Sequence, residues 1–137
     1  MPTVRVSRRV HFSAAHRLHN PAFSPEENAR VFGQCNSPNY HGHNYELDIT
    51  VEGEVDGATG YVVDLGLVRD LAEETVLRDL DHRNLNEDVS WLDGVVPSTE
   101  NLVVKIWERL VGRIPNGRLV RLVLWETPRN YVEYSGG

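Results

Sequence analysis

The sequence predicts an α+β fold in which one antiparallel sheet carries two helices on one face. Two observations support this prediction. Segments with two-residue alternation of apolar and polar side chains are joined by turns, and the two segments with helical spacing follow one another directly. Because two grouped helices can cover only one face of a sheet, the other face must meet solvent or another subunit.

The first predicted strand spans residues 4–16, where alternate residues point to the same face. One parity is apolar except for Arg8 and ends at His16; its apolar members are Val4, Val6, Val10, Phe12 and Ala14. The other parity carries Arg5, Ser7, Arg9 and His11 and predicts a polar second face. His16 is therefore expected at the end of a mainly apolar strand face.

Residues 19–40 read as a long loop, since three prolines interrupt both helix and strand. Loops of this length in small domains usually have a function or are disordered. This loop contains Cys35, the only cysteine of the chain. A second alternating strand follows at residues 41–51, with His41 and His43 at the start of its apolar face.

The remaining elements follow in order. Residues 53–60 predict a turn into a short strand at 61–63, and Asp64 is expected to cap a helix that reaches about residue 80. Ser98 or Thr99 should cap a second helix. Its apolar stripe extends to Ile114, and the helix stops at residues 115–117. Strands at 119–126 and 131–134, with a turn at 128–130, complete the chain.

Length and composition indicate one domain over residues 1–137. The net charge of −6 argues against nonspecific binding to nucleic acid or to an anionic membrane. No apolar run approaches the roughly 20 residues that span a bilayer, and the first residues lack the apolar segment of a signal peptide. With a single cysteine and no possible internal disulfide, we expect a cytoplasmic protein.

Three histidines form a candidate metal site. His41 and His43 are two residues apart in a predicted strand and so present their imidazoles side by side. A neighbouring strand could bring His16 next to them. Three neutral imidazoles and one open position are typical of catalytic zinc, although a His-x-His pair alone also arises by chance.

Other polar residues have more than one interpretation. Cys35 fits a fourth zinc ligand, a thiolate base or nucleophile, or an inert buried thiol. Asp81 and His82 are an acid–imidazole pair, but a histidine at a helix C-terminus is also favoured by the helix dipole alone. Glu126 ends an apolar strand face, either exposed or in a binding site.

Six stretches together resemble the 6-pyruvoyltetrahydropterin synthase family over nearly the whole length. They are Phe-Ser-Ala-Ala-His-Arg-Leu (12–18), Glu-Glu-Asn-Ala-Arg-Val-Phe-Gly-Gln-Cys-Asn-Ser-Pro-Asn (26–39), His-Gly-His-Asn-Tyr (41–45), Leu-Asp-His-Arg-Asn-Leu (80–85), Ser-Thr-Glu-Asn (98–101) and Trp-Glu-Thr (125–127). The resemblance implies the tunnelling fold, a four-stranded antiparallel sheet with two helices on one face. It further implies that trimers form a barrel and that two trimers stack into a homohexamer.

The resemblance also assigns roles to the candidate residues. It implies Zn²⁺ on His16, His41 and His43, and Cys35 as the catalytic base. Asp81 and His82 would tune that base, reaching the site from an adjacent subunit. Glu126 would anchor the pterin with two hydrogen bonds, helped by Ser98 and Thr99. The first of these hydroxyl positions is often threonine in the family, and Ser98 keeps the hydroxyl.

The implied activity is a lyase reaction on 7,8-dihydroneopterin triphosphate that eliminates triphosphate and yields 6-pyruvoyltetrahydropterin. The alternative is the 6-carboxytetrahydropterin synthase of the queuosine pathway, or a non-enzymatic zinc- or pterin-binding module. Five residues separate Cys35 from His41, as in enzymes of the biopterin type, whereas the queuosine type usually has three. The basic residues Arg17, Arg30 and Lys105 are candidates for holding the triphosphate.

Overall fold

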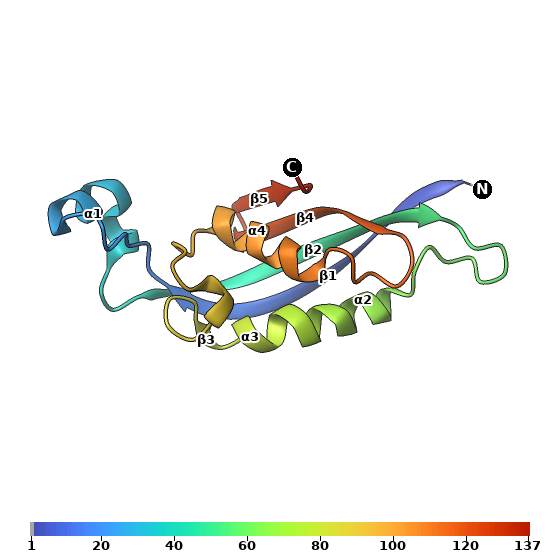
Figure 1. Ribbon diagram of the computed structural model, residues 1–137, viewed down its shortest axis with the longest axis horizontal. Coiled ribbons are helices and arrows are strands. Elements are labelled where there is room, and N and C mark those ends of the chain that lie inside the picture. The colour runs from blue at the N-terminus through green and yellow to red at the C-terminus, as the bar shows by residue number, and fades with distance from the viewer. Residues whose placement is uncertain (1) are drawn as a thin grey trace.

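A long antiparallel hairpin forms the centre of the fold in the computed structural model, which describes residues 2–137 (Figure 1). Its strands are β1 (Thr3–His16) and β2 (His41–Glu54), which pair in register from Thr3 opposite Glu54 to His16 opposite His41. Strand β4 (Arg118–Thr127) pairs with β2, and β5 (Asn130–Tyr134) pairs with β4, both antiparallel. The predicted α+β class and its antiparallel sheet are confirmed.

The sheet has five strands in the order β3-β1-β2-β4-β5, one more than the four that the resemblance implies. The additional strand, β3 (Arg83–Asn84), runs parallel to β1 and pairs with it only at Ala14 and Ala15. It is too short to show an alternating pattern, which is why the sequence did not reveal it. The rest of the outer edge of β1, from Thr3 to Ser13, pairs with no other strand among residues 2–137.

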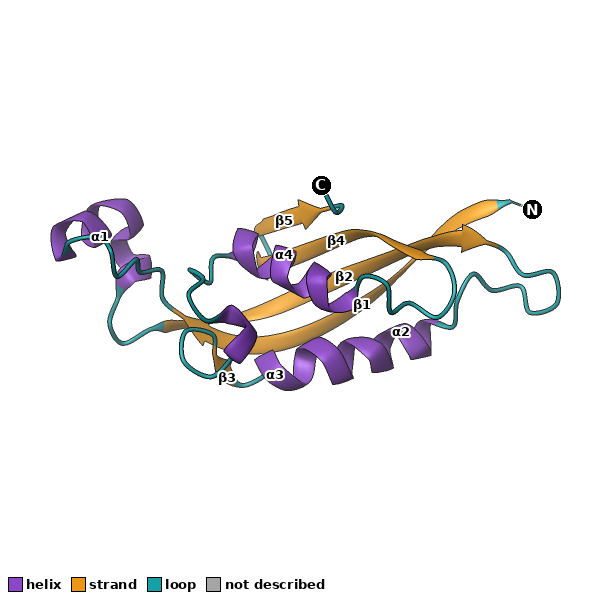
Figure 2. Ribbon diagram, in the orientation of Figure 1, coloured by secondary structure: helices purple, strands orange, loops and turns teal. Residues whose placement is uncertain are grey.

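Helices lie on one face of the sheet (Figure 2). Helix α2 (Leu65–Ala72) continues through a π-helical segment (Glu73–Leu77) into α3 (Arg78–Leu80), so the predicted helix to residue 80 is correct. The carboxylate of Asp64 accepts a hydrogen bond from the amide of Gly66 and caps α2, as predicted. Helix α2 packs on β1, and α4 (Thr99–Leu110) packs on β4 and β5.

The apolar parity of each strand meets these helices and forms the core. Phe12 and Tyr45 are opposite one another in the register, fully buried, with stacked rings 4.8 Å apart. The stripe of α4 closes the core with Leu102, Ile106 and Leu110. The packed core thus extends along the central hairpin toward the end where His16 and His41 lie.

Several boundaries differ from the sequence prediction. Helix α4 ends at Leu110, because Val111 is extended and Gly112 has a φ of 78°. No strand forms at residues 61–63, although Val62 and Val63 are buried in the core. A short apolar run can be buried in a loop as well as in a strand, and the sequence pattern does not distinguish these two structures.

The long loop at residues 19–40 contains ordered structure that the sequence prediction missed. Helix α1 (Pro25–Phe32) begins at the cap residue Ser24 and is followed by a 3₁₀ helix (Gly33–Asn36) that carries Cys35. Helix α1 projects beyond the end of the sheet opposite the N-terminus (Figure 1). Pro25 is at the first helical turn, where proline is favoured, so its presence was a start signal and not a breaker.

The second sheet face is polar, as predicted, and its charges are paired across strands. Arg5 and Arg118 both contact Glu52, and Arg9 contacts Glu46 and Asp48. The guanidinium of Arg9 holds the pKa of Asp48 below its usual range. Within residues 2–137, no helix combines the length and the apolar character needed to cross a membrane.

Candidate active site

Three imidazoles meet at the end of the central hairpin. His16 is directly opposite His41 in the register, and His43 is two residues further along the same face of β2. One ring nitrogen from each of His16, His41 and His43 lies within 4.8 Å of the others. The predicted proximity of the three histidines is therefore confirmed, and it follows from strand register alone.

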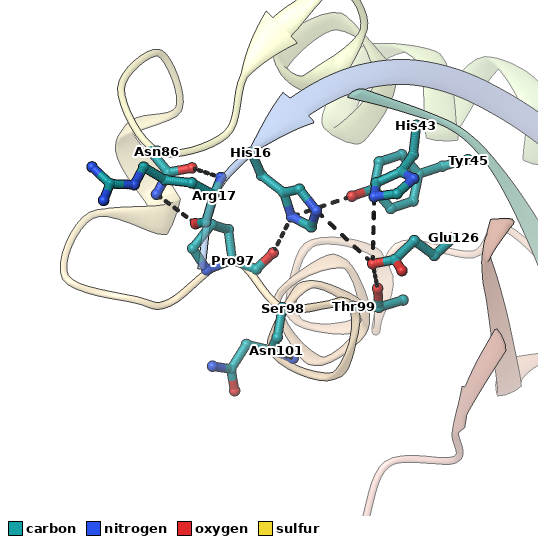
Figure 3. A network of polar contacts seen from close by, with 10 residues as sticks. All are labelled: His16, Arg17, His43, Tyr45, Asn86, Pro97, Ser98, Thr99, Asn101 and Glu126. Atoms are coloured by element: carbon teal, nitrogen blue, oxygen red, sulfur yellow. Dashed lines mark hydrogen bonds and ion pairs between the residues drawn. The ribbon is translucent and has the colours of Figure 1, made fainter. Parts of the chain in front are cut away.

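The tautomer of His16 is set by the backbone. Its Nδ1 lies 2.8 Å from the carbonyl oxygen of Pro97, which can only accept a hydrogen bond, so Nδ1 carries the hydrogen (Figure 3). The other nitrogen, Nε2, therefore keeps its lone pair and points toward the cluster. A metal-binding histidine typically has such a partner on its second nitrogen.

Burial favours the neutral form of two of the imidazoles. His16 is 1% exposed, and desolvation is the main cause that lowers its pKa, with the nearby His41 and His43 acting in the same direction. Burial also lowers the pKa of His43, while the carboxylate of Glu126 opposes this effect. Neutral imidazole is the form that binds metal ions.

The cluster fits a divalent metal ion on chemical grounds. It offers three nitrogen donors and no thiolate, and the hydrogen bond to Pro97 leaves the Nε2 lone pair of His16 available. Three histidines with an open position suit zinc in a catalytic site. The geometry therefore supports a metal site at His16, His41 and His43.

Glu126 faces this cluster from β4. Its Oε2 atom lies 3.9 Å from Nε2 of His16 and 4.0 Å from Nε2 of His43, and it accepts a 2.6 Å hydrogen bond from the hydroxyl of Thr99 (Figure 3). The side chain is 25% exposed. Glu126 is therefore a partly buried residue that faces the histidine cluster and not a freely exposed strand end.

A pocket of about 210 Å³ joins these groups with the thiol. Its lining includes His16, Cys35, Thr99 and Glu126. Cys35 is half-buried, and its carbonyl oxygen accepts a 2.7 Å hydrogen bond from the amide of Leu18. The structure therefore brings the thiol, the imidazole of His16 and the carboxylate to one cavity, although 90 residues separate Cys35 from Glu126 in sequence.

Ser98 also lines this pocket but has a structural role as well. Its hydroxyl oxygen accepts a hydrogen bond from the amide of Asn101 and caps α4. Of the two predicted caps, Ser98 is the one used, while Thr99 is the first helical residue and binds Glu126 instead.

Asp81 and His82 lie outside the pocket of their own chain. They contact each other at 3.1 Å, and the His82 side chain is 82% exposed. The amide of Ser13 donates to Asp81, which is the main cause that lowers the pKa of this carboxyl group. His82 adopts a φ of 61°, which is uncommon for a residue other than glycine. His82 borders an open hollow of about 520 Å³ that is also lined by Gly42 and His43.

The three basic candidates for triphosphate binding do not converge on the pocket. Arg30 pairs with Glu27 on α1, and Lys105 pairs with Glu108 on α4. Arg17 donates to the carbonyl oxygen of Asn36. Sequence reasoning also missed Pro97, because a backbone carbonyl leaves no residue-type signal.

Comparisons with known proteins agree on one family. The family described as 6-pyruvoyl tetrahydropterin synthase matches residues 5–137. The human 6-pyruvoyl tetrahydrobiopterin synthase is 47% identical over 132 residues, covering 96% of this chain and 91% of the human protein. The solved Caenorhabditis elegans 6-pyruvoyl tetrahydropterin synthase superposes with a TM-score of 0.94 at 39% identity, covering 100% and 98% of the two chains. A 6-carboxy-5,6,7,8-tetrahydropterin synthase of Rickettsia bellii is 26% identical, covering 95% and 99%.

Proposed function

Because the chain belongs to the 6-pyruvoyl tetrahydropterin synthase family, we propose that it converts 7,8-dihydroneopterin triphosphate into 6-pyruvoyltetrahydropterin and eliminates triphosphate. One observation carries the proposal beyond family membership: Cys35, His16 and Glu126 line the same cavity. A base, a metal ligand and a group that can bind a pterin are thus within reach of one small substrate.

His16, His41 and His43 would hold a zinc ion. The bound ion would supply a Lewis acid beside the side-chain oxygens of the substrate. Two features favour metal binding by these side chains. Burial lowers the pKa of His16 and of His43, which favours their neutral form, and the hydrogen bond from Nδ1 of His16 to Pro97 leaves Nε2 free.

Glu126 would bind the pterin ring. An ionised carboxylate can accept two hydrogen bonds from the guanidine-like edge formed by the amino group and the adjacent ring N–H. The Thr99 hydroxyl already donates to Oε2 and so limits the rotation of the carboxylate. This contact would orient the pterin with its side chain toward the histidines and Cys35.

Cys35 would act as the base. Thiolate is the working form of cysteine, and a nearby cation favours it. The thiolate would remove a proton from the side-chain carbon next to the polarised oxygen, and the electron pair would expel triphosphate from the adjacent position. Proton shifts would then move the reducing equivalents into the ring. The redox change is internal to the substrate, so this lyase reaction needs no nicotinamide cofactor.

Asp81 and His82 would complete the site of a neighbouring subunit in a homohexamer of two stacked trimers. Two features support this arrangement. The pair is exposed and outside the pocket of its own chain, and most of the β1 edge lacks a strand partner within residues 2–137. Edge strands with free backbone groups are commonly paired or covered in folded proteins.

The alternative product is 6-carboxytetrahydropterin, formed from the same substrate with loss of acetaldehyde. The five residues between Cys35 and His41, together with 47% identity to the human enzyme against 26% to the Rickettsia enzyme, favour the pyruvoyl product.

Release of inorganic triphosphate tests whether the chain is an enzyme. Zinc-loaded protein mixed with 7,8-dihydroneopterin triphosphate is expected to release about one triphosphate per substrate over many turnovers. Binding of the substrate without release of triphosphate would support a binding module and overturn the proposed function.

A further inference from the structure

Hydrogen bonds join the two chain segments that carry His16 and Cys35. The amide of Leu18 donates to the carbonyl oxygen of Cys35 at 2.7 Å, and Nδ2 of Asn36 donates back to the carbonyl oxygen of Leu18 at 2.8 Å. The end of β1 and the 3₁₀ helix are thus linked directly beside the residues that line the pocket.

The ring of His19 lies at the centre of this link. Its Nδ1 is 3.1 Å from Nη2 of Arg17 and 2.9 Å from Nδ2 of Asn36. Both partners can only donate, so Nδ1 must accept and His19 must carry its hydrogen on Nε2. Nη2 of Arg17 also donates to the carbonyl oxygen of Asn36 at 3.0 Å, which closes the network.

Arg17 depends on this network because it has no carboxylate partner among the ion pairs of residues 2–137. Its Nε atom is buried and lacks a hydrogen-bond partner. A guanidinium in such a setting is costly unless its remaining donors are satisfied. His19 and the Asn36 carbonyl provide the acceptors for Nη2, so loss of His19 leaves one contact in place of two.

The backbone of Arg17 is fixed independently. Asn86 accepts from the Arg17 amide at 2.9 Å and donates to the Arg17 carbonyl oxygen at 3.0 Å (Figure 3). In Figure 3, Arg17 and Asn86 lie on the side of His16 away from Glu126. The segment after His16 is therefore anchored, and His19 connects the Cys35 segment to that anchor.

We propose that His19 is a positioning residue that holds Cys35 at a fixed place relative to His16 through the hydrogen bonds at Nδ1. The proposal rests on the proposed function in taking Cys35 as the base. Proton transfer requires the base within hydrogen-bonding reach of its carbon acid, and a displacement of about 1 Å can cost about a hundredfold in rate.

Two substitutions of His19 isolate the Nδ1 contacts. His19→Phe keeps a ring but removes the acceptor, whereas His19→Asn places an oxygen at nearly the position of Nδ1. Tyr40→Phe is the matched control, because Tyr40 borders the same 460 Å³ hollow as Arg17 and His19 but donates its hydroxyl to Glu87. Asn36→Ala removes the other side of the network and serves if His19→Phe fails to fold.

Alkylation by iodoacetamide reports on Cys35 alone, because it is the only cysteine of the chain. We expect His19→Phe to raise the alkylation rate at least about threefold and to lower kcat at least about tenfold, with KM changed less than about twofold and zinc content unchanged. His19→Asn should restore both rates, Asn36→Ala should match His19→Phe, and Tyr40→Phe should match the unmodified protein.

Two results would overturn the proposal. The first is unchanged alkylation and kcat in His19→Phe, or in Asn36→Ala if His19→Phe does not fold. The second is a His19→Asn protein that is as impaired as His19→Phe. The alkylation measurement needs no substrate and so is independent of the assigned reaction. Absence of triphosphate release by the unmodified protein would overturn the proposed function, and full turnover by Cys35→Ala would overturn the role of Cys35 as the base. In either case an alkylation effect of His19→Phe would still establish the link between His19 and Cys35.

Discussion

The carbonyl oxygen of Pro97 accepts a hydrogen bond from Nδ1 of His16 at 2.8 Å. Ser98, the next residue, caps α4, and the hydroxyl of Thr99 donates to Glu126. Three consecutive residues thus orient a candidate metal ligand, begin a helix and hold the candidate pterin-binding carboxylate. The start of α4 therefore couples the end of β1 to β4 across the site.

Substitution of one histidine should abolish both metal binding and activity. His43→Ala leaves two imidazoles, too few for a three-nitrogen site. We expect less than about a tenth of the zinc and of the turnover to remain, measured by elemental analysis and by triphosphate release. His11→Ala is the control, since His11 is exposed on the polar sheet face, and it should keep its metal. Full activity of a metal-free His43→Ala protein would refute the metal site.

The stability of the metal-free protein should fall as the pH drops below the ordinary imidazole pKa of 6.5. Burial lowers the pKa of His16 and His43 in the folded state, so the unfolded chain binds protons first as the pH decreases. The stabilisation that the neutral His16 and His43 contribute is fully present above pH 6.5. It is lost progressively as the pH falls toward their lowered pKa values in the folded protein. Urea unfolding between pH 7.5 and 5.5 measures the free energy of unfolding; a constant or rising value across this range would contradict the expected sign.

Removal of the thiol should separate catalysis from metal binding. Cys35→Ala is expected to lower kcat by about 10² to 10⁴, the usual contribution of a general base, and to keep about one zinc per subunit. Zinc content and triphosphate release, measured on the same sample, check this. Loss of the metal would instead indicate that Cys35 is a ligand of a closed structural site.

Neighbouring hydroxyls should give different phenotypes. Ser98→Ala removes the cap of α4 and should lower the free energy of unfolding by about 1 kcal/mol. Thr99→Val removes the donor to Glu126 and should raise KM about fivefold, equivalent to one hydrogen bond. Thr99→Ser keeps the hydroxyl and is the control. Equal effects of the Ser98 and Thr99 variants on both quantities would show that the two roles are not separate.

Strand patterns predicted most of the fold, because each long strand buries one parity. The register between β1 and β2, which brings His16 opposite His41, was not predicted, because alternation determines which face each residue occupies but not how far one strand is shifted along the other. The predicted strand at 61–63 was wrong, because side chains can be buried without backbone pairing to another strand. Strand β3 and helix α1 were missed because one is two residues long and the other lies in a segment rich in prolines.

The site was harder to predict from the sequence than the fold. His41 and His43 could be recognised from their spacing, but Cys35 and Glu126 come to line one cavity only through tertiary packing. The Pro97 carbonyl and the His19 link carry no motif at all, since backbone acceptors and ring tautomers depend on the folded geometry. The roles implied for Asp81 and His82 stay predictions, because their own chain leaves them exposed.

Mass spectrometry of the pterin product tests the central claim most directly. Zinc-loaded protein incubated with 7,8-dihydroneopterin triphosphate under anaerobic conditions should yield 6-pyruvoyltetrahydropterin together with triphosphate and no acetaldehyde. A product with the mass of 6-carboxytetrahydropterin, accompanied by acetaldehyde, or recovery of unchanged substrate would contradict the assignment.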